Sequence, residues 1–486
     1  MDELAGKRVV ILGLARQGKA LARFAAEAGA QVIVSDLRPP PELQETLDEL
    51  RDLEIEYVLG EHPMTLLDKA DLLATSGGVP ADSPLVAAAR ARGIPVTNDS
   101  QEFMKRTPAT VVGITGSAGK TTTTALTGVM AQLAGRRTWI GGNIGRPLIA
   151  DLHKMEPDDV VVQELSSFQL EIWTQEFSRE LGPRTWQSPP VAAVLNITPN
   201  HLDRHKTMKA YASAKANILR YQSTEDIAIL SADDPGSLAL RPLVRGRLRL
   251  FTLEGAVSDG AFVQDGNICL RNAVAHNNVA HNNVAHNGRQ TVVCAVSDVR
   301  LRGRHNLANV LAAVTLADSI GVPAEAIAEA IRTFKGVEHR LEVVRTVNGV
   351  RYVNDSIATA PERVLAALHA FDEPIVLLAG GRDKDMAWEE WARQVRRRVK
   401  RVILFGELAD TLEKQLTGRG GACTRPVVTL TRVTTLAEAI AAAAAAATPG
   451  DVVLFSPGGT SYDAFTDFAE RGKVFRTLVN DLEGKT

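Results

Sequence analysis

Segment 113–122, Gly-Ile-Thr-Gly-Ser-Ala-Gly-Lys-Thr-Thr, has the residue types of a phosphate-binding loop. Glycines let backbone N–H groups curl around phosphate oxygens, and a helix that starts at the end of the loop adds partial positive charge. In this interpretation Lys120 reaches the β- and γ-phosphates of a nucleoside triphosphate, and the Thr121 hydroxyl holds Mg²⁺. The residues assigned to nucleotide binding are Gly116, Ser117, Ala118, Gly119, Lys120, Thr121 and Thr122. The strict motif has glycine where this chain has Ile114, so the loop is a variant, and a glycine turn with a solvated lysine is the alternative.

Two side chains further along the chain could bind a divalent cation beside this loop. Glu164 ends the strand-like run 160–163, and His201 follows the run 191–196. Because the carboxyl ends of parallel strands share one edge of a sheet, both side chains could reach an ion next to the γ-phosphate. Either residue alone would be interpreted as a capping or packing residue. Lys215 follows His201 by fourteen residues, and its helical surroundings alone favour an exposed lysine.

A second glycine loop, Gly-Leu-Ala-Arg-Gln-Gly at 13–18, follows the first strand-like run and is close to a dinucleotide-binding fingerprint. Asp36 ends the next strand eighteen residues later, where an acidic residue would bind a ribose hydroxyl. The middle glycine is replaced by Ala15, whose methyl group hinders a close approach to pyrophosphate. A nicotinamide-dependent enzyme is therefore an alternative that leaves the triphosphate loop unexplained.

The residues with chemical potential stand where short β-branched runs end. Such runs, followed by glycine and a helical pattern, predict parallel strands with helices on both faces, and hence an α/β fold. They cover 8–12, 31–35, 110–114, 160–163, 191–196, 375–379, 402–405 and 452–455. Ligands bind at the strand ends of such sheets, which is where the candidate residues lie.

A length of 486 residues exceeds what one hydrophobic core supports, so about two to four domains are expected. The pattern predicts a Rossmann-like N-terminal domain over 1–98, a central domain like a P-loop ATPase over 99–336, and a Rossmann-like C-terminal domain over 337–486. Segment 274–288 repeats Val-Ala-His-Asn-Asn twice and ends with Val-Ala-His-Asn-Gly. Its histidines recur every five residues, which matches neither a helix face nor a strand face, so a surface insertion is favoured over a metal site.

Composition argues against several classes of function. Lys plus Arg number 55 and Asp plus Glu number 57, a formal charge of −2 that indicates neither nucleic acid nor an anionic membrane as a partner. Three scattered cysteines without CxxC spacing predict neither a disulfide framework nor a zinc site. The N-terminal segment lacks the pattern of a secretory signal, and the apolar run 440–447 is too short to span a bilayer. We therefore expect a soluble, cytoplasmic protein.

These motifs, in this order, resemble the Mur ligase family across essentially the whole chain. Further marks of the resemblance are Gly-Gly-Asn-Ile-Gly at 141–145, Glu-Leu-Ser-Ser-Phe-Gln-Leu-Glu at 164–171, His-Leu-Asp-Arg at 201–204, Gly-Arg-His-Asn-Leu-Ala-Asn at 303–309, His-Arg at 339–340, Asn-Asp-Ser at 354–356, Gly-Gly-Arg-Asp-Lys at 380–384 and Ser-Pro at 456–457. The runs 164–170 and 461–472 look like the branch that adds D-glutamate. Each piece alone is unspecific, whereas the combination is specific.

The resemblance implies catalytic and nucleotide-binding roles for named residues. Glu164 and His201 match Mg²⁺ residues, and Lys215 matches a lysine that is carbamylated with CO₂ and then helps to orient one of two magnesium ions. Lys120, His201 and Lys215 are thereby implied as catalytic residues. The residues implied to contact ATP from other segments are Asn306, Asn309, Arg340 and Asp355.

The resemblance also implies positions that bind the other substrates. The residues on the uridine diphosphate side are Ala15, Arg16, Asp36 and Arg38, with Asn143 near the sugar. The residues around an incoming glutamate are Thr359, Lys384, Ser461, Tyr462 and Phe468. Two positions depart from the family pattern, because Ile357 stands where some relatives have lysine and Ala118 where asparagine is common.

The reaction implied by the resemblance is ATP-dependent amide-bond formation in the synthesis of peptidoglycan precursors. The alanyl carboxylate of UDP-N-acetylmuramoyl-L-alanine would attack the γ-phosphate, and the amine of D-glutamate would attack the resulting acyl phosphate. The candidates for the base that deprotonates the amine are His201 and a phosphate oxygen. The alternatives are a sister ligase that adds another amino acid or L-glutamate, a folate polyglutamylating enzyme and a non-catalytic nucleotide-binding protein. We expect a monomer whose partners are these small molecules.

Overall fold

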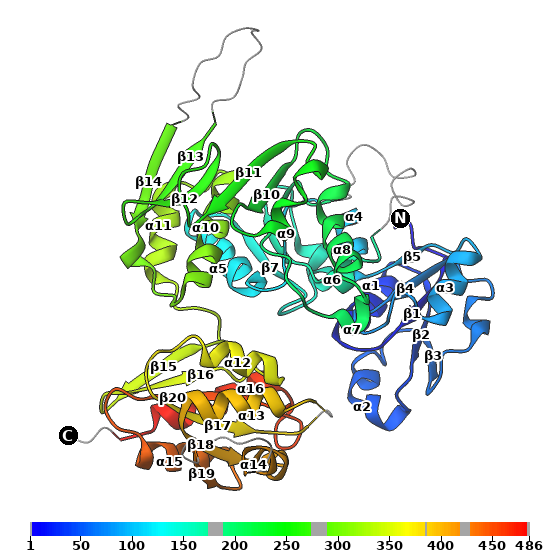
Figure 1. Cartoon of the computed structure of the whole chain (residues 1–486). Coiled ribbons are helices and arrows are strands. Elements are labelled where there is room, and N and C mark those ends of the chain that lie inside the picture. Colours follow the sequence, from blue (N-terminus) through cyan, green and yellow to red (C-terminus); the bar gives the residue numbers. More distant parts are fainter. Residues whose placement is uncertain (1, 174–187, 274–288, 384–385, 418–427, 484–486) are drawn as a thin grey trace. The chain divides into compact units, whose positions relative to one another are not determined.

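The computed structural model describes residues 2–173, 188–273, 289–383, 386–417 and 428–483. Within these residues the strands form three sheets of five, nine and six strands, each covered by helices (Figure 1). The predicted α/β class is confirmed. The chain divides into a large unit, Met1–Arg300 with Arg304–Phe334, and a small unit, Leu301–Gly303 with Lys335–Thr486. The histidine repeat at 274–288 and Lys384 lie outside the described residues.

The first sheet of the large unit is parallel and has the strand order β3-β2-β1-β4-β5. Its strands are β1 (Arg8–Leu12), β2 (Gln31–Asp36), β3 (Ile55–Leu59), β4 (Leu72–Thr75) and β5 (Val96–Thr97). Its helices are α1 (Arg16–Glu27), α2 (Pro40–Glu49), η1 (Met64–Leu67), α3 (Pro84–Ala91) and α4 (Asp99–Arg106). The strand order reverses between β1 and β4, so the loops that follow these two strands flank a crevice of the kind that binds ligands.

The central sheet of the large unit has the order β14-β13-β12-β11-β10-β9-β6-β8-β7. Its strands are β6 (Thr110–Thr115), β7 (Thr138–Gly142), β8 (Val160–Glu164), β9 (Val191–Val194), β10 (Ile227–Ser231), β11 (Arg247–Thr252), β12 (Gly260–Gln264), β13 (Asn267–Asn272) and β14 (Arg289–Ala295). The sheet is parallel as far as β12, and β13 and β14 add an antiparallel edge. This edge begins at Asp265-Gly266, which form a two-residue turn with φ of 48° and 73°.

Helices cover both faces of the central sheet. Helices α5, α10 and α11 pack together on one face, and α8 packs on the other face against β6 and β9. The helical segments are α5 (Lys120–Leu133), η2 (Leu148–Lys154), α6 (Ser167–Leu170), α7 (Leu202–His205), α8 (Met208–Arg220), α9 (Pro235–Leu238), η4 (Arg241–Leu243), η5 (Val296–Asp298), α10 (Arg304–Ser319) and α11 (Ala324–Thr333). Buried side chains such as Ile11, Phe103 and Val161 belong to one apolar core that continues from the first sheet to the central sheet, which joins the two sheets in one unit.

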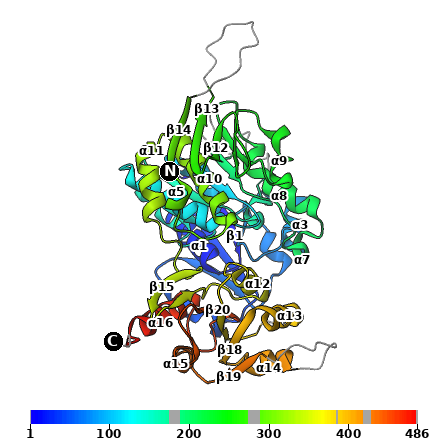
Figure 2. The same cartoon turned by 60° about the vertical axis from the view of Figure 1, so that its left-hand side comes forward.

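The small unit contains the third sheet, in the order β15-β16-β20-β17-β18-β19. Its strands are β15 (Glu342–Val347), β16 (Val350–Asn354), β17 (Ile375–Gly380), β18 (Val399–Phe405), β19 (Thr429–Arg432) and β20 (Val452–Gly458). Its helices are α12 (Pro361–Leu368), α13 (Glu389–Arg398), α14 (Ala409–Thr417), α15 (Leu436–Ala446) and α16 (Phe468–Asn480). Helices α12 to α14 cover one face and α15 and α16 cover the other (Figure 2). Strands β15 and β16 are antiparallel and are joined by the two-residue turn Asn348-Gly349.

Among the described residues, no helix combines the length and the apolar character that crossing a bilayer would require.

Candidate active site

The phosphate loop lies between β6 and α5, as the sequence predicts. Gly119 has a left-handed backbone, with φ of 85°, and Lys120 is the first residue of α5. The ammonium of Lys120 donates to the carbonyl of Gly116 over 2.8 Å and to that of Ser117 over 3.3 Å. The lysine therefore lies over the loop whose N–H groups would face a phosphate.

Asn196, which the sequence analysis did not single out, fixes the backbone of this loop. Its side-chain amide accepts from the Ala118 N–H over 2.8 Å and donates to the Ala118 carbonyl over 3.1 Å. Its own carbonyl accepts from the Ser117 N–H over 2.9 Å. The position of Asn196 just beyond the end of β9 was the available signal, because side chains at strand ends reach the loops of neighbouring strands.

Glu164 lies directly beside the phosphate loop. One carboxylate oxygen accepts from the Thr121 hydroxyl over 2.9 Å, and the other accepts from the side-chain amide of Asn143 over 2.8 Å. Glu164 is 1% exposed and Thr121 is 7% exposed. The structure thus brings together two of the residues predicted to bind metal and one predicted to bind substrate.

Lys215 is buried in this site, so the exposed lysine favoured by the helical pattern is wrong. Helix α8 packs onto the phosphate loop, and the Lys215 ammonium donates to the Gly116 carbonyl over 2.8 Å. The ammonium also lies 4.7 Å from the ring centroid of Tyr211, whose hydroxyl donates to the Ser117 hydroxyl. Burial, together with the positive charge of Lys120, holds the pKa of Lys215 well below its ordinary value, and Glu164 offsets this only in part.

His201 precedes α7 in a left-handed conformation, with φ of 52° and ψ of 35°. A left-handed backbone is uncommon outside glycine and often marks a functional segment. The His201 ring contacts Phe168 edge-on, with 4.9 Å between centroids, and lies 6.5 Å from Tyr211. Among the described residues, no three His, Cys, Asp or Glu side chains form a metal-binding group. A divalent ion at this site would therefore draw on the Thr121 hydroxyl and on ligand oxygens as well as on Glu164.

The loops of the first sheet carry the predicted uridine-side residues. Asp36 is buried and binds the Arg38 guanidinium through both carboxylate oxygens, and it also accepts from the N–H groups of Leu14 and Arg38. Burial alone would raise the pKa of Asp36, but these bonds lower it to about 2. Ala15 caps the N-terminus of α1, and Arg16 donates to the backbone carbonyl of Asn143 over 3.1 Å. Arg16 therefore connects the first glycine loop to Asn143, whose side-chain amide is hydrogen-bonded to Glu164.

Asn309 and Asn306 lie on the first turns of α10, and Asn309 approaches the phosphate loop. A Cβ atom at Gly119 would come within 2.1 Å of the Asn309 side-chain oxygen. The Asn309 amide donates to the Asn306 side chain over 3.2 Å. The structure therefore places the two predicted adenine-side residues together at the turn where α5 begins.

In the small unit Asp355 follows β16 and is fully buried. Its carboxylate accepts from the Ser456 hydroxyl over 2.8 Å and from the Leu341 N–H over 3.2 Å. Burial raises the pKa of Asp355 to about 7, although these bonds and the charge of Arg340 oppose the shift. His339, next to Arg340, has φ of 63° and is hydrogen-bonded to the Asn354 side chain. The segment that carries Arg340, between the left-handed residues His339 and Leu341, is thus hydrogen-bonded to the second predicted ATP residue, Asp355.

Arg471, a residue that the sequence analysis did not assign, organises the predicted glutamate-side segments. Its guanidinium is fully buried and donates to the carbonyls of Ser356, Gly459 and Thr460. Burial lowers its pKa to about 10. Among the predicted residues nearby, Thr359 and Phe468 are half-buried, Ser461 is buried and Tyr462 is 60% exposed. The available signal was the place of Arg471 in the 461–472 run that contributes to the family resemblance.

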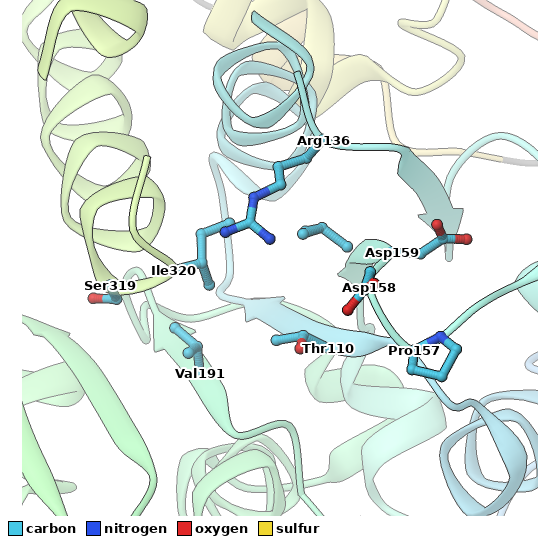
Figure 3. Close-up of a pocket in the computed structure, with 9 residues that line it drawn as sticks. Thr110, Arg136, Pro157, Asp158, Asp159, Val191, Ser319 and Ile320 are labelled. Carbon is cyan, nitrogen blue, oxygen red and sulfur yellow. The ribbon is translucent and has the colours of Figure 1, made fainter. Parts of the chain in front are cut away.

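A cavity of about 340 Å³ lies at the opposite end of the central sheet, where β6, β8 and β9 begin. Thr110, Val191 and Ile320 form part of its wall, and Figure 3 shows the Arg136 side chain extending between Ile320 and Asp158. Because ligands of parallel sheets bind at the carboxyl ends of the strands, this cavity is separate from the candidate active site.

Comparisons with known proteins identify the family of the chain. Three family models match the chain: "Mur ligase MurD-like, N-terminal domain" over residues 7–98, "Mur ligase middle domain" over 114–317 and "Mur ligase, glutamate ligase domain" over 339–459. Each match lies inside one of the three predicted domains.

Similar proteins cover the whole length of the chain. A UDP-N-acetylmuramoylalanine–D-glutamate ligase of Pelotomaculum thermopropionicum is 38% identical over 99% of both chains, and one of Symbiobacterium thermophilum is 39% identical over 98% of both. Among solved structures, the UDP-N-acetylmuramate-alanine ligase of Thermotoga maritima has a TM-score of 0.55 at 19% identity, covering 97% of this chain and 99% of that one. The pseudomurein peptide ligase type C of Methanothermus fervidus has a TM-score of 0.52 at 17% identity, covering 98% of this chain and 100% of that one. These two structures support the fold alone.

Proposed function

The chain belongs to the Mur ligase family, and we propose that it is an ATP-dependent ligase that adds D-glutamate to UDP-N-acetylmuramoyl-L-alanine during synthesis of peptidoglycan precursors. The observation that carries the proposal is the convergence of the phosphate loop, Glu164 and Lys215 at one end of the central sheet. Arg16, from the predicted uridine-side loop, reaches the same place through Asn143. A monomeric state and a cytoplasmic location belong to the same proposal.

The proposed reaction is phosphoryl transfer followed by acyl transfer. The alanyl carboxylate attacks the γ-phosphate of ATP, which gives an acyl phosphate and ADP. The glutamate amine then attacks the acyl carbon, and inorganic phosphate leaves. Lys120 lies over the loop and would stabilise the negative charge that gathers on the transferred phosphoryl group.

Magnesium fits the oxygen donors that the site offers, because Glu164 and Thr121 are buried together and belong to the ligand types that Mg²⁺ prefers. His201 completes the proposed set, and two ions are part of the proposal. When bound, magnesium would neutralise part of the triphosphate charge.

We also propose that Lys215 is carbamylated. A buried lysine with a lowered pKa is neutral for part of the time, and only the neutral amine can attack CO₂. The product is a carbamate and a released proton, so a cation that opposes Lys120 is replaced by an anion that suits a metal site. This conversion removes the cost of burying an ammonium group next to a second one.

A nicotinamide-dependent function receives little support from the first sheet. In dinucleotide-binding folds the acidic residue at this position binds ribose hydroxyls. Here both oxygens of Asp36 are already occupied by Arg38 and by the Leu14 N–H. The remaining alternative is a sister ligase that performs the same chemistry with L-glutamate or another amino acid. The amino acid that supports the fastest turnover in the assay distinguishes it from the proposed ligase.

The test is phosphate release from ATP with UDP-N-acetylmuramoyl-L-alanine and a panel of amino acids that includes D-glutamate and L-glutamate. We expect turnover that requires both acceptor substrates and is fastest with D-glutamate. Lys120→Ala should lower kcat by at least about a hundred-fold with the fold intact, because it removes a donor to the transition-state charge. Lys154→Ala, which removes an exposed lysine paired with Asp151, is the matched control and should retain activity. Folded, magnesium-loaded protein that releases no phosphate with any pair of acceptors would overturn the proposal.

A further inference from the structure

Arg204 joins the two sheets of the large unit. It belongs to α7, on the segment that begins with His201, and its side chain is 14% exposed. One terminal nitrogen donates to the carbonyl of Gly77 over 2.8 Å, and the other donates to the carbonyl of Val79 over 2.7 Å. A single guanidinium thereby holds both sides of a loop that belongs to the first sheet.

The loop held in this way, residues 77–79, follows β4 at the reversal of strand order in the first sheet. It lies beside the glycine loop after β1, because the Gln17 side chain accepts from the Gly77 N–H over 3.3 Å. A Cβ atom at Gly13 would come within 2.5 Å of the Ser76 hydroxyl, so these two loops are in close contact. The 77–79 loop is therefore one wall of the crevice in which the fold would bind the nucleotide end of a substrate.

Arg204 is itself held by the segment that follows β8. Glu171 accepts from its second terminal nitrogen over 2.7 Å. The ring of Phe168 lies under the guanidinium, with 3.9 Å from the Arg204 Cζ atom to the ring centroid. The same ring contacts His201. Phe168 and Glu171 stand on or next to α6, which follows Glu164 in the chain.

We propose that Arg204 is a positioning residue, which fixes the 77–79 loop relative to His201 and Glu164 so that a UDP-linked substrate binds with its carboxylate at the triphosphate. The fork of the guanidinium is suited to this task, because two donors at a fixed spacing can bind two carbonyls at once. The identity of the ligand rests on the proposed function, whereas the contacts across the two sheets do not.

The first readout of the test does not require activity. Hydrogen–deuterium exchange is compared between the full-length wild-type protein, Arg204→Ala and Arg204→Lys without ligands. We expect faster exchange over residues 76–79 in Arg204→Ala and no change over the phosphate loop. Arg204→Lys should lie between the two, because an ammonium keeps the charge but does not reproduce the fork.

The second readout separates binding of the UDP-linked substrate from binding of ATP. Loss of hydrogen bonds to a charged group predicts that Arg204→Ala raises the KM for UDP-N-acetylmuramoyl-L-alanine by about ten-fold to a hundred-fold. The KM for ATP should stay at the wild-type value. Arg23→Ala is the matched control, because Arg23 binds Asp52 and the Glu49 carbonyl within the first sheet alone. It should change neither KM nor the exchange of residues 76–79.

Two results would overturn the inference. One is unchanged exchange over residues 76–79 in Arg204→Ala, and the other is an equal rise in the KM for both ATP and the UDP-linked substrate. If Arg204→Ala does not fold, Arg204→Lys and Glu171→Gln carry the same comparison. Wild-type protein without ligase activity would refute the proposed function, and the exchange measurement would still decide the role of Arg204.

Discussion

Replacing Asp355 by asparagine should stabilise the small unit at alkaline pH while it impairs catalysis. Asp355 is 4% exposed, and its carboxylate is bound by the Ser456 hydroxyl and the Leu341 N–H. Arg340 and Arg363 are the positive charges that favour its ionised form, yet burial outweighs them and raises the pKa to about 7. Asparagine has nearly the same shape and carries no charge, so Asp355→Asn removes the cost of ionising a carboxyl group in the core.

The size of the effect follows from the displaced pKa. The carboxyl titrates near 3.8 in an unfolded chain and at about 7 in the folded protein, and each unit corresponds to 1.36 kcal/mol, so the cost is on the order of 4 kcal/mol above pH 7. Between these two pKa values the folded state binds more protons than the unfolded state. The free energy of unfolding contributed by Asp355 therefore falls as pH rises from about 4 to about 7. Asp355→Asn should abolish this fall.

The assay is native-state hydrogen exchange of the amides in β16 and β20 at pH 5 and pH 8. After correction for the intrinsic exchange rate, the small unit of the wild type should open more easily at pH 8 than at pH 5. The free energy of opening of Asp355→Asn should be the same at both pH values. Asp451, the residue directly before β20, provides a control of opposite sign. Burial opposes its ionisation too, but Lys400 and Thr448 lower its pKa, so Asp451→Asn should destabilise the unit at pH 8. If Asp355→Asn shows the same pH dependence as wild type, burial does not set the titration of Asp355.

Three further predictions concern the large unit. In the presence of ¹³C-labelled CO₂, a carbamate signal should appear in the NMR spectrum of the wild type and be absent from Lys215→Ala; its absence from active wild type would refute carbamylation. Gly119→Ala should weaken ATP binding in calorimetry, since it imposes a left-handed conformation on alanine and a contact with Asn309, at about 1–3 kcal/mol for the backbone alone. Binding of the UDP-linked substrate should be unchanged, and equal loss for both ligands would contradict this reasoning. Burial works against ionisation of Glu102, but Lys105 and Arg106 lower its pKa, so its contribution to stability is present at neutral pH and is lost as pH falls through this lowered pKa. Glu102→Gln should cost about 3–5 kcal/mol at pH 7 in thermal unfolding, and the cost should shrink once the pH falls below the lowered pKa of Glu102; a cost that stays constant across an acid titration would show that the ion pairs are not responsible.

Local sequence signals were sufficient for the framework of the active site. The Gly-Lys-Thr core required a strand before it and a helix after it, and β6 and α5 lie there. The contact between Glu164 and Thr121 follows from the rule that parallel strands end at one edge of a sheet. The antiparallel edges also carried a local signal, because Asp265-Gly266 and Asn348-Gly349 are typical two-residue hairpin turns.

Side chains whose role depends on contacts distant in sequence were out of reach. Arg204 binds the carbonyl of Gly77, 127 residues earlier, and Arg471 binds Ser356, 115 residues earlier. A helical pattern reports which face of a helix is apolar, but not which loop another element places over it. For that reason Lys215 has the local pattern of a surface lysine although it is 1% exposed.

Three buried ionisable residues, Lys215, Asp355 and Arg471, form no ion pair within the part of the chain that the structure describes. An uncompensated buried charge is unfavourable, and a fold selected for stability alone would replace it by an apolar residue of similar size. Each of the three is instead held by neutral donors or acceptors, which keep the group in place without cancelling its charge. For Lys215 this arrangement favours the neutral amine, which is the form that can react with CO₂. The cost of Asp355 to stability and its proposed role in ATP binding have the same origin, a carboxyl group held in the core, so Asp355→Asn should remove both together.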